Sequence, residues 1–453
     1  MMKKYVKSIT VIFLVLLMTF SAVACNSTPS KVSNEKLKES QQNAADGKIE
    51  GSVTFTYHLG GGHNQSDEKA ANRFISAFSK KYKNVDVKPD YSAITDARIS
   101  SAEIGDVFYF SEDKAYKYAV TDKALLPLTG YLEPLGIKQA DVYSGIYALG
   151  LIDGQLYFVA RDYNHMALIY NKGAVAEAGL TSSVKPEWTW AEFQQIAEQL
   201  CNDEYYAMDL NLTYSPVFTA FFEGYAGREA WCNTSDKKIT FIDEDGEILK
   251  AVKEAVELAR KHYIKINGVN EQDENLSGKS AIFQTVAYPS AQSMAKTYDA
   301  SGVEWDLINM PLFEVPSFGC GSSGVGVFNR TQNPTAAAAL ALFFFTSEGQ
   351  VAFNSGDGGS VPLLASLRDS GFDAWKFPDD PNWSVKNWDA FTFMADTAST
   401  PGQVVCRMPA DIADQITKQI PTILKNDLSG AGSVEDGFKA LEQTCNELWG
   451  KLS

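Results

Sequence analysis

The chain has 453 residues, a hydrophobic content of 45% and a formal net charge of −16. A single hydrophobic core rarely extends beyond about 250–300 residues, so this length predicts two domains rather than one. A chain this acidic would be repelled by phosphate backbones, which argues against a nucleic acid partner.

The N-terminus has the organisation of an export signal. Lysines at positions 3, 4 and 7 precede an apolar stretch over residues 9–20, which is too short to span a bilayer comfortably. The stretch ends in Ser21-Ala22-Val23-Ala24-Cys25, and small residues followed by Cys resemble the bacterial lipobox. We therefore expect residues 1–24 to be a lipoprotein signal peptide and Cys25 to carry the lipid, because two or more acyl chains anchor a protein stably. Ordinary secretory cleavage beside an incidental cysteine is the alternative.

Residues 25–50 read as a flexible tether, because they lack aromatic residues and carry few apolar ones. The cysteines beyond Cys25 are odd in number, are scattered and include no C-x-x-C pair, which does not fit a disulfide framework. One bridge could form among them, and the sequence does not identify it. These cysteines are Cys201, Cys232, Cys320, Cys406 and Cys445.

From residue 51 onward, strand and helix patterns alternate, which predicts an α/β fold with mainly parallel sheets. The first strand is expected at residues 53–58, and the helix after it has apolar residues at helical spacing. A later helix begins at Thr189 and carries Glu192 three residues on, which is the signature of a capping box. The first helix places Ala70, Ala71, Phe74, Ile75 and Phe78 on one side. Further strands are expected at 85–88, 106–110, 156–160, 166–170, 278–283, 306–312 and 325–329, and further helices at 247–263, at 334–347 and from Ser433 onward.

Catalytic and metal-binding patterns fail on spacing. Gly278-Lys279-Ser280 ends like a phosphate-binding loop, but Asp273 stands where that loop requires glycine. The four histidines form no metal-binding pair. Carboxylates that could act as a glycosidase pair are plentiful, and none is singled out. We therefore expect no catalytic residues, no metal and no cofactor.

The sequence favours ligand binding over catalysis, because polar and aromatic residues cluster just after the ends of predicted strands. Open α/β sheets bind ligands beyond the carboxyl ends of their strands, where residues 60–64, 110–113 and 163–165 fall. Aromatic rings there could stack on sugars, and Asn, Asp and His could bind hydroxyl groups. We expect Trp188, Trp190 and Trp305 to lie in the core instead.

The stretch 150–200 contains several short motifs that occur together in one known family. They are Gly154-Gln155-Leu156-Tyr157, Leu168-Ile169-Tyr170-Asn171-Lys172, Ala178-Gly179-Leu180, Pro186, Thr189-Trp190 and Glu192-Phe193. With these motifs the stretch resembles the family-1 extracellular solute-binding proteins, the carbohydrate-binding subunits of ABC importers, and is similar to maltose-binding protein. Weaker matches follow in the family's order at residues 78–87, 105–107, 278–283, 310–311 and 347–350, so the resemblance spans about residues 51–365.

The resemblance implies a two-lobed clamp of the periplasmic-binding-protein type, each lobe a mainly parallel sheet flanked by helices. Lobe 1 would comprise residues 51–162 and 313–347, and lobe 2 residues 163–312 and 348–453. The chain would cross between lobes near Tyr163, near Leu312 and near Ser347.

Carried over by position, the resemblance also implies a set of sugar contacts. Gly61 and Gly62 stand where maltose-binding protein has charged residues, which points away from maltose but not from carbohydrate. The implied contacts are His63, Asn64, Phe110, Asp113, Asn164, Tyr214, Tyr288 and Arg407.

The expected function is capture of an oligosaccharide in the cleft and delivery to an ABC permease. The protein would be a monomer, outside the cytoplasm and held to the cell membrane by its lipid. Two alternatives stay open: a surface glycoside hydrolase, and a sugar-sensing lipoprotein without a transport role.

Overall fold

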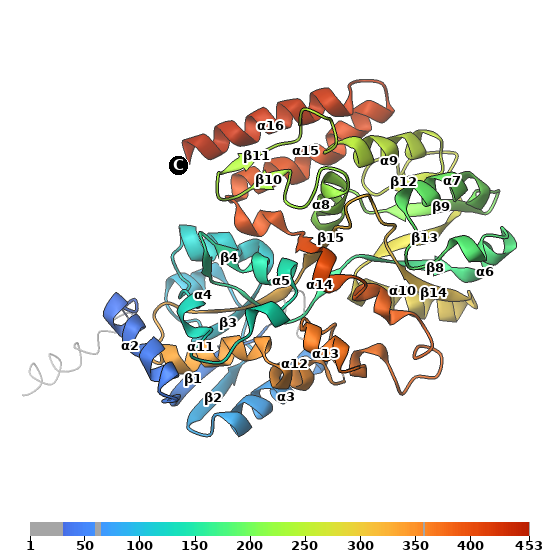
Figure 1. The fold of residues 1–453 in the computed structure, drawn as a ribbon. Coiled ribbons are helices and arrows are strands. Elements are labelled where there is room, and N and C mark those ends of the chain that lie inside the picture. The colour runs from blue at the N-terminus through green and yellow to red at the C-terminus, as the bar shows by residue number, and fades with distance from the viewer. Residues whose placement is uncertain (1–29, 59–64, 357, 453) are drawn as a thin grey trace, which may run out of the picture.

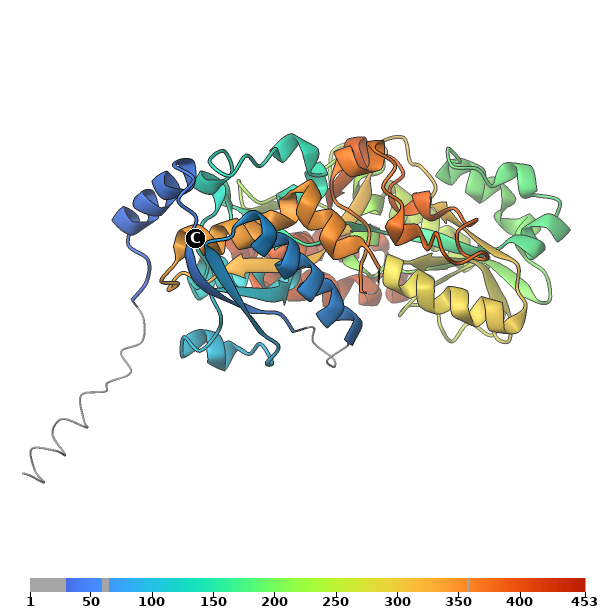
Figure 2. The ribbon, with the colours of Figure 1, turned by 90° about the horizontal axis from the view of Figure 1, so that it is seen from below.

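The computed structural model describes residues 30–58, 65–356 and 358–452, and it contains two five-stranded sheets with helices on their faces (Figure 1). Each sheet and its helices form one lobe, and the lobes lie side by side along the molecule (Figures 1 and 2). We call the lobe with the N-terminal strands lobe 1 and the other lobe 2. The predicted α/β class, with sheets flanked by helices, is confirmed.

The sheet of lobe 1 has the strand order β2-β1-β3-β16-β6. β1 pairs in parallel with β2 and β3, and β16 runs antiparallel to β3 and β6. Four of the five residues of β3 are buried, which explains its unbroken apolar run at the middle of the sheet. The strands are β1 (Gly51–Thr56), β2 (Val85–Asp90), β3 (Val107–Ser111), β6 (Val159–Ala160) and β16 (Ser323–Val327).

The helices of lobe 1 pack on this sheet through aromatic side chains. In α3 (Gln65–Lys81), the residues predicted to face the core are buried, except for Ile75, which is half-buried. Phe74 of α3 stacks on Phe344, with ring centroids 3.9 Å apart. Every residue of α11 (Pro334–Leu342) is buried, which explains its alanine-rich sequence. The other helices here are α4 (Asp96–Ser100), α5 (Ser144–Leu149) and α12 (Ser347–Asn354).

The sheet of lobe 2 has the strand order β12-β9-β13-β8-β14. β9 pairs in parallel with β12 and β13, whereas β8 runs antiparallel to β13 and β14. The prediction of mainly parallel sheets is therefore wrong. Pairing in both sheets is mixed, because β8 and β16, the strands that follow crossings between the lobes, run against their neighbours. The strands are β8 (Ala167–Asn171), β9 (Tyr205–Leu210), β12 (Ile264–Ile266), β13 (Ser280–Val286) and β14 (Trp305–Asn309).

The helices of lobe 2 confirm two predictions. Thr189 caps α7 (Trp190–Leu200), and the reciprocal bonds of a capping box with Glu192 are both present. Trp188, Trp190 and Trp305 are buried. The other helices are α6 (Lys172–Glu177), α8 (Ser215–Glu223), α9 (Lys250–Arg260), α10 (Tyr288–Ser301), α15 (Ala410–Leu428) and α16 (Val434–Lys451).

Residues 34–45 form a helix, α2 (Asn34–Ala45), that packs on lobe 1, so this part of the predicted tether is folded. Ser40 and Ala44 are only 3% exposed, and the Ser40 hydroxyl is hydrogen-bonded to the hydroxyl of Tyr131. The sequence does not show the apolar pattern of a helix here, because small residues, rather than large apolar ones, form the buried face of α2.

Several short elements connect the larger ones. They are β4 (Leu151–Ile152), β5 (Gln155–Leu156), β10 (Cys232–Asn233), β11 (Lys238–Ile239), α13 (Ala365–Asp369) and α14 (Ala395–Ala398).

The predicted lobe boundary at residue 347 stays a prediction, but the contacts of α12 place residues 348–354 beside lobe 1. α12 packs against α3, and Arg73 of α3 donates hydrogen bonds to the carbonyls of Ala352 and Phe353 at 3.1 and 2.9 Å. Within the described ranges, no single helix is long and apolar enough to cross a membrane; α11 with its following turn, and α12, pass such a test only as a pair bent by 70°.

Candidate functional site

A small third sheet lies between the two lobes and joins distant parts of the chain (Figure 1). It consists of β7 (Asn164–His165), β15 (Phe318–Gly321) and β17 (Ser399–Pro401). β15 pairs antiparallel with β7 and parallel with β17. β7 connects β6 of lobe 1 to β8 of lobe 2, and β15 connects β14 of lobe 2 to β16 of lobe 1. The crossings expected near Tyr163 and Leu312 thus fall at or just before these two strands, and we call this sheet the hinge sheet.

The polar run around β7 was expected to face water or a ligand, yet most of it is buried. Tyr163 and His165 are both 0% exposed. His165 Nε2 lies 2.7 Å from the carbonyl of Ala390, and Nδ1 lies 3.0 Å from the Tyr163 hydroxyl. The carbonyl can only accept, so Nε2 carries the proton and Nδ1 accepts from Tyr163. Burial lowers the pKa of His165 to about 4, which keeps the ring neutral. These two residues therefore stabilise the hinge.

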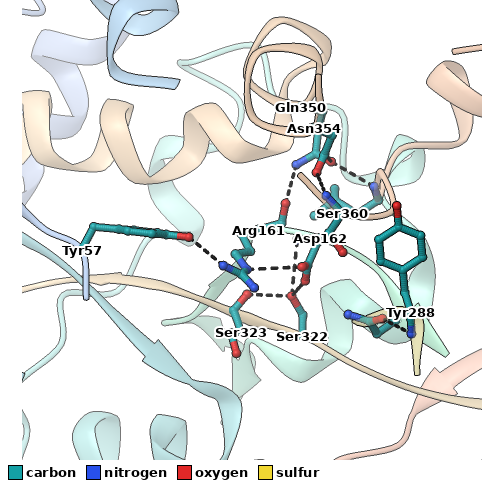
Figure 3. A network of polar contacts seen from close by, with 11 residues as sticks. Tyr57, Arg161, Asp162, Tyr288, Ser322, Ser323, Gln350, Asn354 and Ser360 are labelled. Carbon is teal, nitrogen blue, oxygen red and sulfur yellow. Dashed lines mark hydrogen bonds and ion pairs between the residues drawn. The ribbon is translucent and has the colours of Figure 1, made fainter. Parts of the chain in front are cut away.

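Arg161 and Asp162 begin a polar network at the lobe 1 side of the hinge sheet (Figure 3). Arg161 Nη1 donates to the Tyr57 hydroxyl at 2.7 Å, and Arg161 Nε lies 3.2 Å from Asp162 Oδ2. The Ser322 hydroxyl donates to Asp162 Oδ1 at 2.7 Å. The guanidinium also lies over the Tyr109 ring, 5.4 Å from its centroid. The network joins the crossing at β7 to the crossing at β15 and to the end of β1.

Gln350 and Asn354 of α12 extend this network to the segment after α12 (Figure 3). Gln350 Nε2 donates to the carbonyls of Arg161 and Phe344 at 2.9 and 2.8 Å. Gln350 Oε1 accepts from Asn354 Nδ2 at 3.1 Å and from the backbone of Leu363 at 3.0 Å. Both amide side chains are 0% exposed, and their hydrogen bonds offset the free-energy cost of burying polar groups in the core. The segment after α12 also lies beside the crossing at β7, because the backbone N–H of Tyr163 donates to the carbonyl of Val361 at 2.9 Å.

The two lobes approach each other at the carboxyl end of β3, where Glu112 is buried. Its residue is 8% exposed, and burial raises the pKa of its carboxyl group to about 8. A Cβ atom at Gly321 would lie only 2.9 Å from Glu112 Oε1 and 3.3 Å from Gln403 Cγ, so glycine allows these side chains to approach the hinge sheet. Gln403 Nε2 donates to the Tyr214 hydroxyl of lobe 2 at 3.1 Å. A neutral carboxyl, an amide and a phenol can all donate and accept hydrogen bonds, as sugar hydroxyl groups require.

A second buried carboxylate, Glu223 at the end of α8, fastens lobe 2 to the hinge sheet. It is 1% exposed and accepts from the Ser317 hydroxyl at 2.6 Å and from the Thr400 hydroxyl at 3.3 Å. The backbone N–H of Glu229 donates to it at 2.9 Å. Burial raises the pKa of Glu223 to about 7, and the negative charge of Glu229 acts in the same direction.

Two of the predicted sugar contacts lie inside the protein in this structure. Phe110 is 5% exposed and packs among the rings of Phe108, Tyr118 and Phe158. Tyr288 is 2% exposed, and its hydroxyl donates to the carbonyl of Trp375. Neither ring has an open face for a sugar in this conformation, so their stacking role stays a prediction.

The other predicted contacts have mixed surroundings. Asn164 is half-buried in β7, and its side-chain oxygen lies 3.4 Å from the backbone nitrogen of Tyr288. Asp113 is exposed, and Tyr214 is 38% exposed beside Gln403. Arg407 pairs with Glu229 at 3.3 Å and donates to the Thr234 hydroxyl at 3.1 Å, which holds it within lobe 2. His63 and Asn64 lie outside the described residues.

The structure therefore brings Tyr214 together with two residues that sequence reasoning missed, Glu112 and Gln403. Glu112 stands in the same polar run as the predicted Asp113, directly after a buried strand, which is the signal that could have indicated it. Gln403 carries no comparable signal, because it is 189 residues away from Tyr214 in the chain. In the described parts of the chain, no group of three or more His, Cys, Asp or Glu residues could hold a metal ion. All five described cysteines are free thiols.

Comparisons with known proteins agree with this geometry. Residues 73–405 match the family described as bacterial extracellular solute-binding protein. A search of curated protein sequences finds no match.

Solved structures share the fold over nearly their whole length. The sugar-binding protein MalE from Xanthomonas citri superposes with a TM-score of 0.67 at 18% identity, over 88% of this chain and 98% of that one. The cyclic alpha-maltosyl-1,6-maltose binding protein from Arthrobacter globiformis gives 0.67 at 19% identity, over 88% and 99%. An ABC substrate-binding protein from Listeria monocytogenes, solved in complex with cycloalternan, gives 0.62 at 16% identity, over 88% and 99%.

Proposed function

Because this chain belongs to the bacterial extracellular solute-binding protein family, which its residues 73–405 match, we propose that it binds an oligosaccharide between its lobes and delivers it to an ABC-type importer. The observation that carries this proposal is the hinge sheet. Its strand β7 contains Asn164, and its strand β15 ends at Gly321, beside Glu112 and Gln403. Gln403 in turn donates a hydrogen bond to Tyr214 of lobe 2. The choice of an oligosaccharide rests on relatives of the same fold, whose names state a sugar, a cyclic maltosyl-maltose and cycloalternan.

The proposed contacts are those polar side chains that are at or near the junction of the lobes. Asn164, Asp113 and Tyr214 keep the role that the resemblance assigned to them, and Glu112 and Gln403 join them. His63 and Asn64 keep that role by position in the sequence alone. The contact roles of Phe110, Tyr288 and Arg407 stay predictions, because in this structure the two rings are buried and Arg407 is paired with Glu229.

Binding closes the clamp because a ligand that contacts both lobes gains its full set of interactions only in the closed state. We therefore expect a panel of linear and cyclic oligosaccharides to contain a ligand that raises the melting temperature and changes tryptophan fluorescence. Tyr214→Ala should weaken binding of that ligand by about 1–3 kcal/mol, in line with the loss of an aromatic contact. A response to peptides or polyamines, with none to any sugar, would reject the carbohydrate assignment.

The protein acts as a binder and not as an enzyme in this proposal. Incubation with the bound oligosaccharide should leave it intact, and the appearance of shorter products would favour a glycoside hydrolase. Deletion of the protein should abolish uptake of the sugar, whereas unchanged uptake would favour a sensing role.

The export signal and the residue after it complete the proposal. Cys25 carries the lipid, and the protein works as a monomer on the outer face of the cell membrane. Cells given a labelled fatty acid should label the natural protein and not Cys25→Ser; equal labelling of the two would refute the anchor.

A further inference from the structure

The first described residues are fastened to lobe 1 by several independent contacts. The backbone N–H of Val32 donates to the carbonyl of Asn329 at 2.7 Å, and Ser33 caps α2. Further along, the Thr335 hydroxyl donates to the carbonyl of Ser40 at 3.1 Å, and Ala44 is buried in the core of lobe 1. Contacts between the chain and lobe 1 therefore begin at Val32, well before β1.

This attachment shortens the chain available to connect the body to Cys25. Only residues 26–31 lie between Cys25 and Val32. A fully extended chain spans at most about 3.6 Å per residue, so the attachment point lies within roughly 25 Å of the lipidated cysteine. A chain that ran free to β1 would have nearly four times that reach.

The attachment point lies at one end of the molecule. In both views α2 and α6 lie at opposite ends of the molecule (Figures 1 and 2). Three segments meet at Asn329, because its backbone accepts from Val32 and its side chain donates to the carbonyl of Lys123. The exposed charges there are of both signs, because Glu35 and Asp122 are exposed along with Lys31 and Lys123.

We propose that α2 holds the outer end of lobe 1 close to the membrane surface, with α6 of lobe 2 farther from the bilayer. The inference rests on the lipid anchor of the proposed function and is independent of which sugar is bound. It assigns α2 the role of setting the height and the orientation of the clamp above the membrane.

Energy transfer from the protein to the membrane tests this arrangement. The lipidated full chain carries a donor dye on Gln332→Cys, beside the attachment point, or on Glu177→Cys in α6, each in a Cys201→Ser background. The vesicles contain phosphatidylglycerol, phosphatidylcholine and an acceptor-labelled lipid. We expect transfer from position 332 to exceed transfer from position 177 severalfold. Equal transfer from the two positions would overturn the proposal.

Two adjacent alanines provide a matched pair of variants. Ala44→Arg forces a charge into the core of lobe 1 and should release α2, whereas Ala45 is exposed and Ala45→Arg should not. Transfer from position 332 should fall severalfold for Ala44→Arg alone. Insertion of about 20 Gly and Ser residues after residue 28 should lower transfer in the same way without touching the fold. Unchanged transfer after this insertion would contradict the proposal, even if Ala44→Arg failed to fold.

Two further measurements test the lipid anchor and the proposed sugar binding separately. Retention of Cys25→Ser on vesicles would remove the lipid anchor as a premise. Oligosaccharide binding in solution should be equal in all these variants, so its failure would bear on the proposed function alone.

Discussion

The substitution Glu223→Gln should stabilise the protein much more at pH 8 than at pH 5. The carboxyl of Glu223 is buried at the end of α8, and its pKa rises from an ordinary 4.5 to about 7 in the folded protein. A proton is therefore held more tightly in the folded state than in the unfolded state. The stability that this proton provides is fully present below pH 4.5 and is lost as the pH rises through 7.

The magnitude follows from the size of the shift. Each pKa unit corresponds to about 1.4 kcal/mol, so the step from 4.5 to 7 is worth about 3 kcal/mol. Glutamine is a suitable replacement because its amide N–H can donate to the Ser317 hydroxyl, as the protonated acid would. Its oxygen can still accept from the backbone of Glu229 and from Thr400.

The assay is denaturant unfolding of the natural protein and of the variant at pH 5, 6, 7 and 8. Comparison of the two proteins cancels the titration of all other groups, including His165, whose lowered pKa acts in the opposite direction. The difference in free energy of unfolding should grow from about 1 kcal/mol at pH 5 toward about 3 kcal/mol at pH 8. The exposed Glu314→Gln serves as the control, and its difference should not change with pH. A constant difference for Glu223→Gln across this range would refute the reasoning.

Three further predictions concern the hinge, a helix cap and the thiols. Gln350→Ala should lower the free energy of unfolding by about 3 kcal/mol, because it leaves the buried N–H of Leu363 and two buried carbonyls without a partner. The control is Gln332→Ala, at an exposed position, which should leave the free energy of unfolding almost unchanged. Equal losses for the two variants in denaturant unfolding would contradict this prediction. Thr189→Ala should cost about 1 kcal/mol through loss of the capping box, and an unchanged melting temperature would argue against it. Among the five described cysteines, Cys201 should react first with a thiol reagent at pH 8, because the others are buried and burial raises the pKa of Cys232 and Cys445 to about 12. Mass spectrometry identifies the modified residue, and modification of Cys320 at the same rate would show that the hinge opens readily.

Local chemistry explains which predictions from the sequence succeed. The capping box of Thr189 and Glu192 involves residues three positions apart, so the sequence alone contains both partners. The buried tryptophans at 188, 190 and 305 follow from the size and hydrophobicity of the side chain, which hold in any fold.

The predictions that fail or fall short depend on distant contacts. The run from Arg161 to His165 is polar, and nothing nearby in the sequence shows that Ala390, Tyr57 and Ser322 supply its partners. α2 reads as a tether because its buried positions are Ser40 and Ala44, which carry too little apolar surface to mark a helix face. The Glu112 group is assembled by the approach of two lobes, and its close packing depends on a glycine at position 321.

The hinge sheet also constrains the thermodynamics of closure. Two lobes joined by one flexible link would sample many relative orientations, and a ligand would have to offset the loss of that freedom. Here the strands lie side by side and share hydrogen bonds, and the buried amide of Gln350 ties the segment after α12 to them. Such a joint bends about one direction and resists twisting, so the open clamp already has most of the order of the closed one. More of the free energy of each sugar contact is then left to determine affinity.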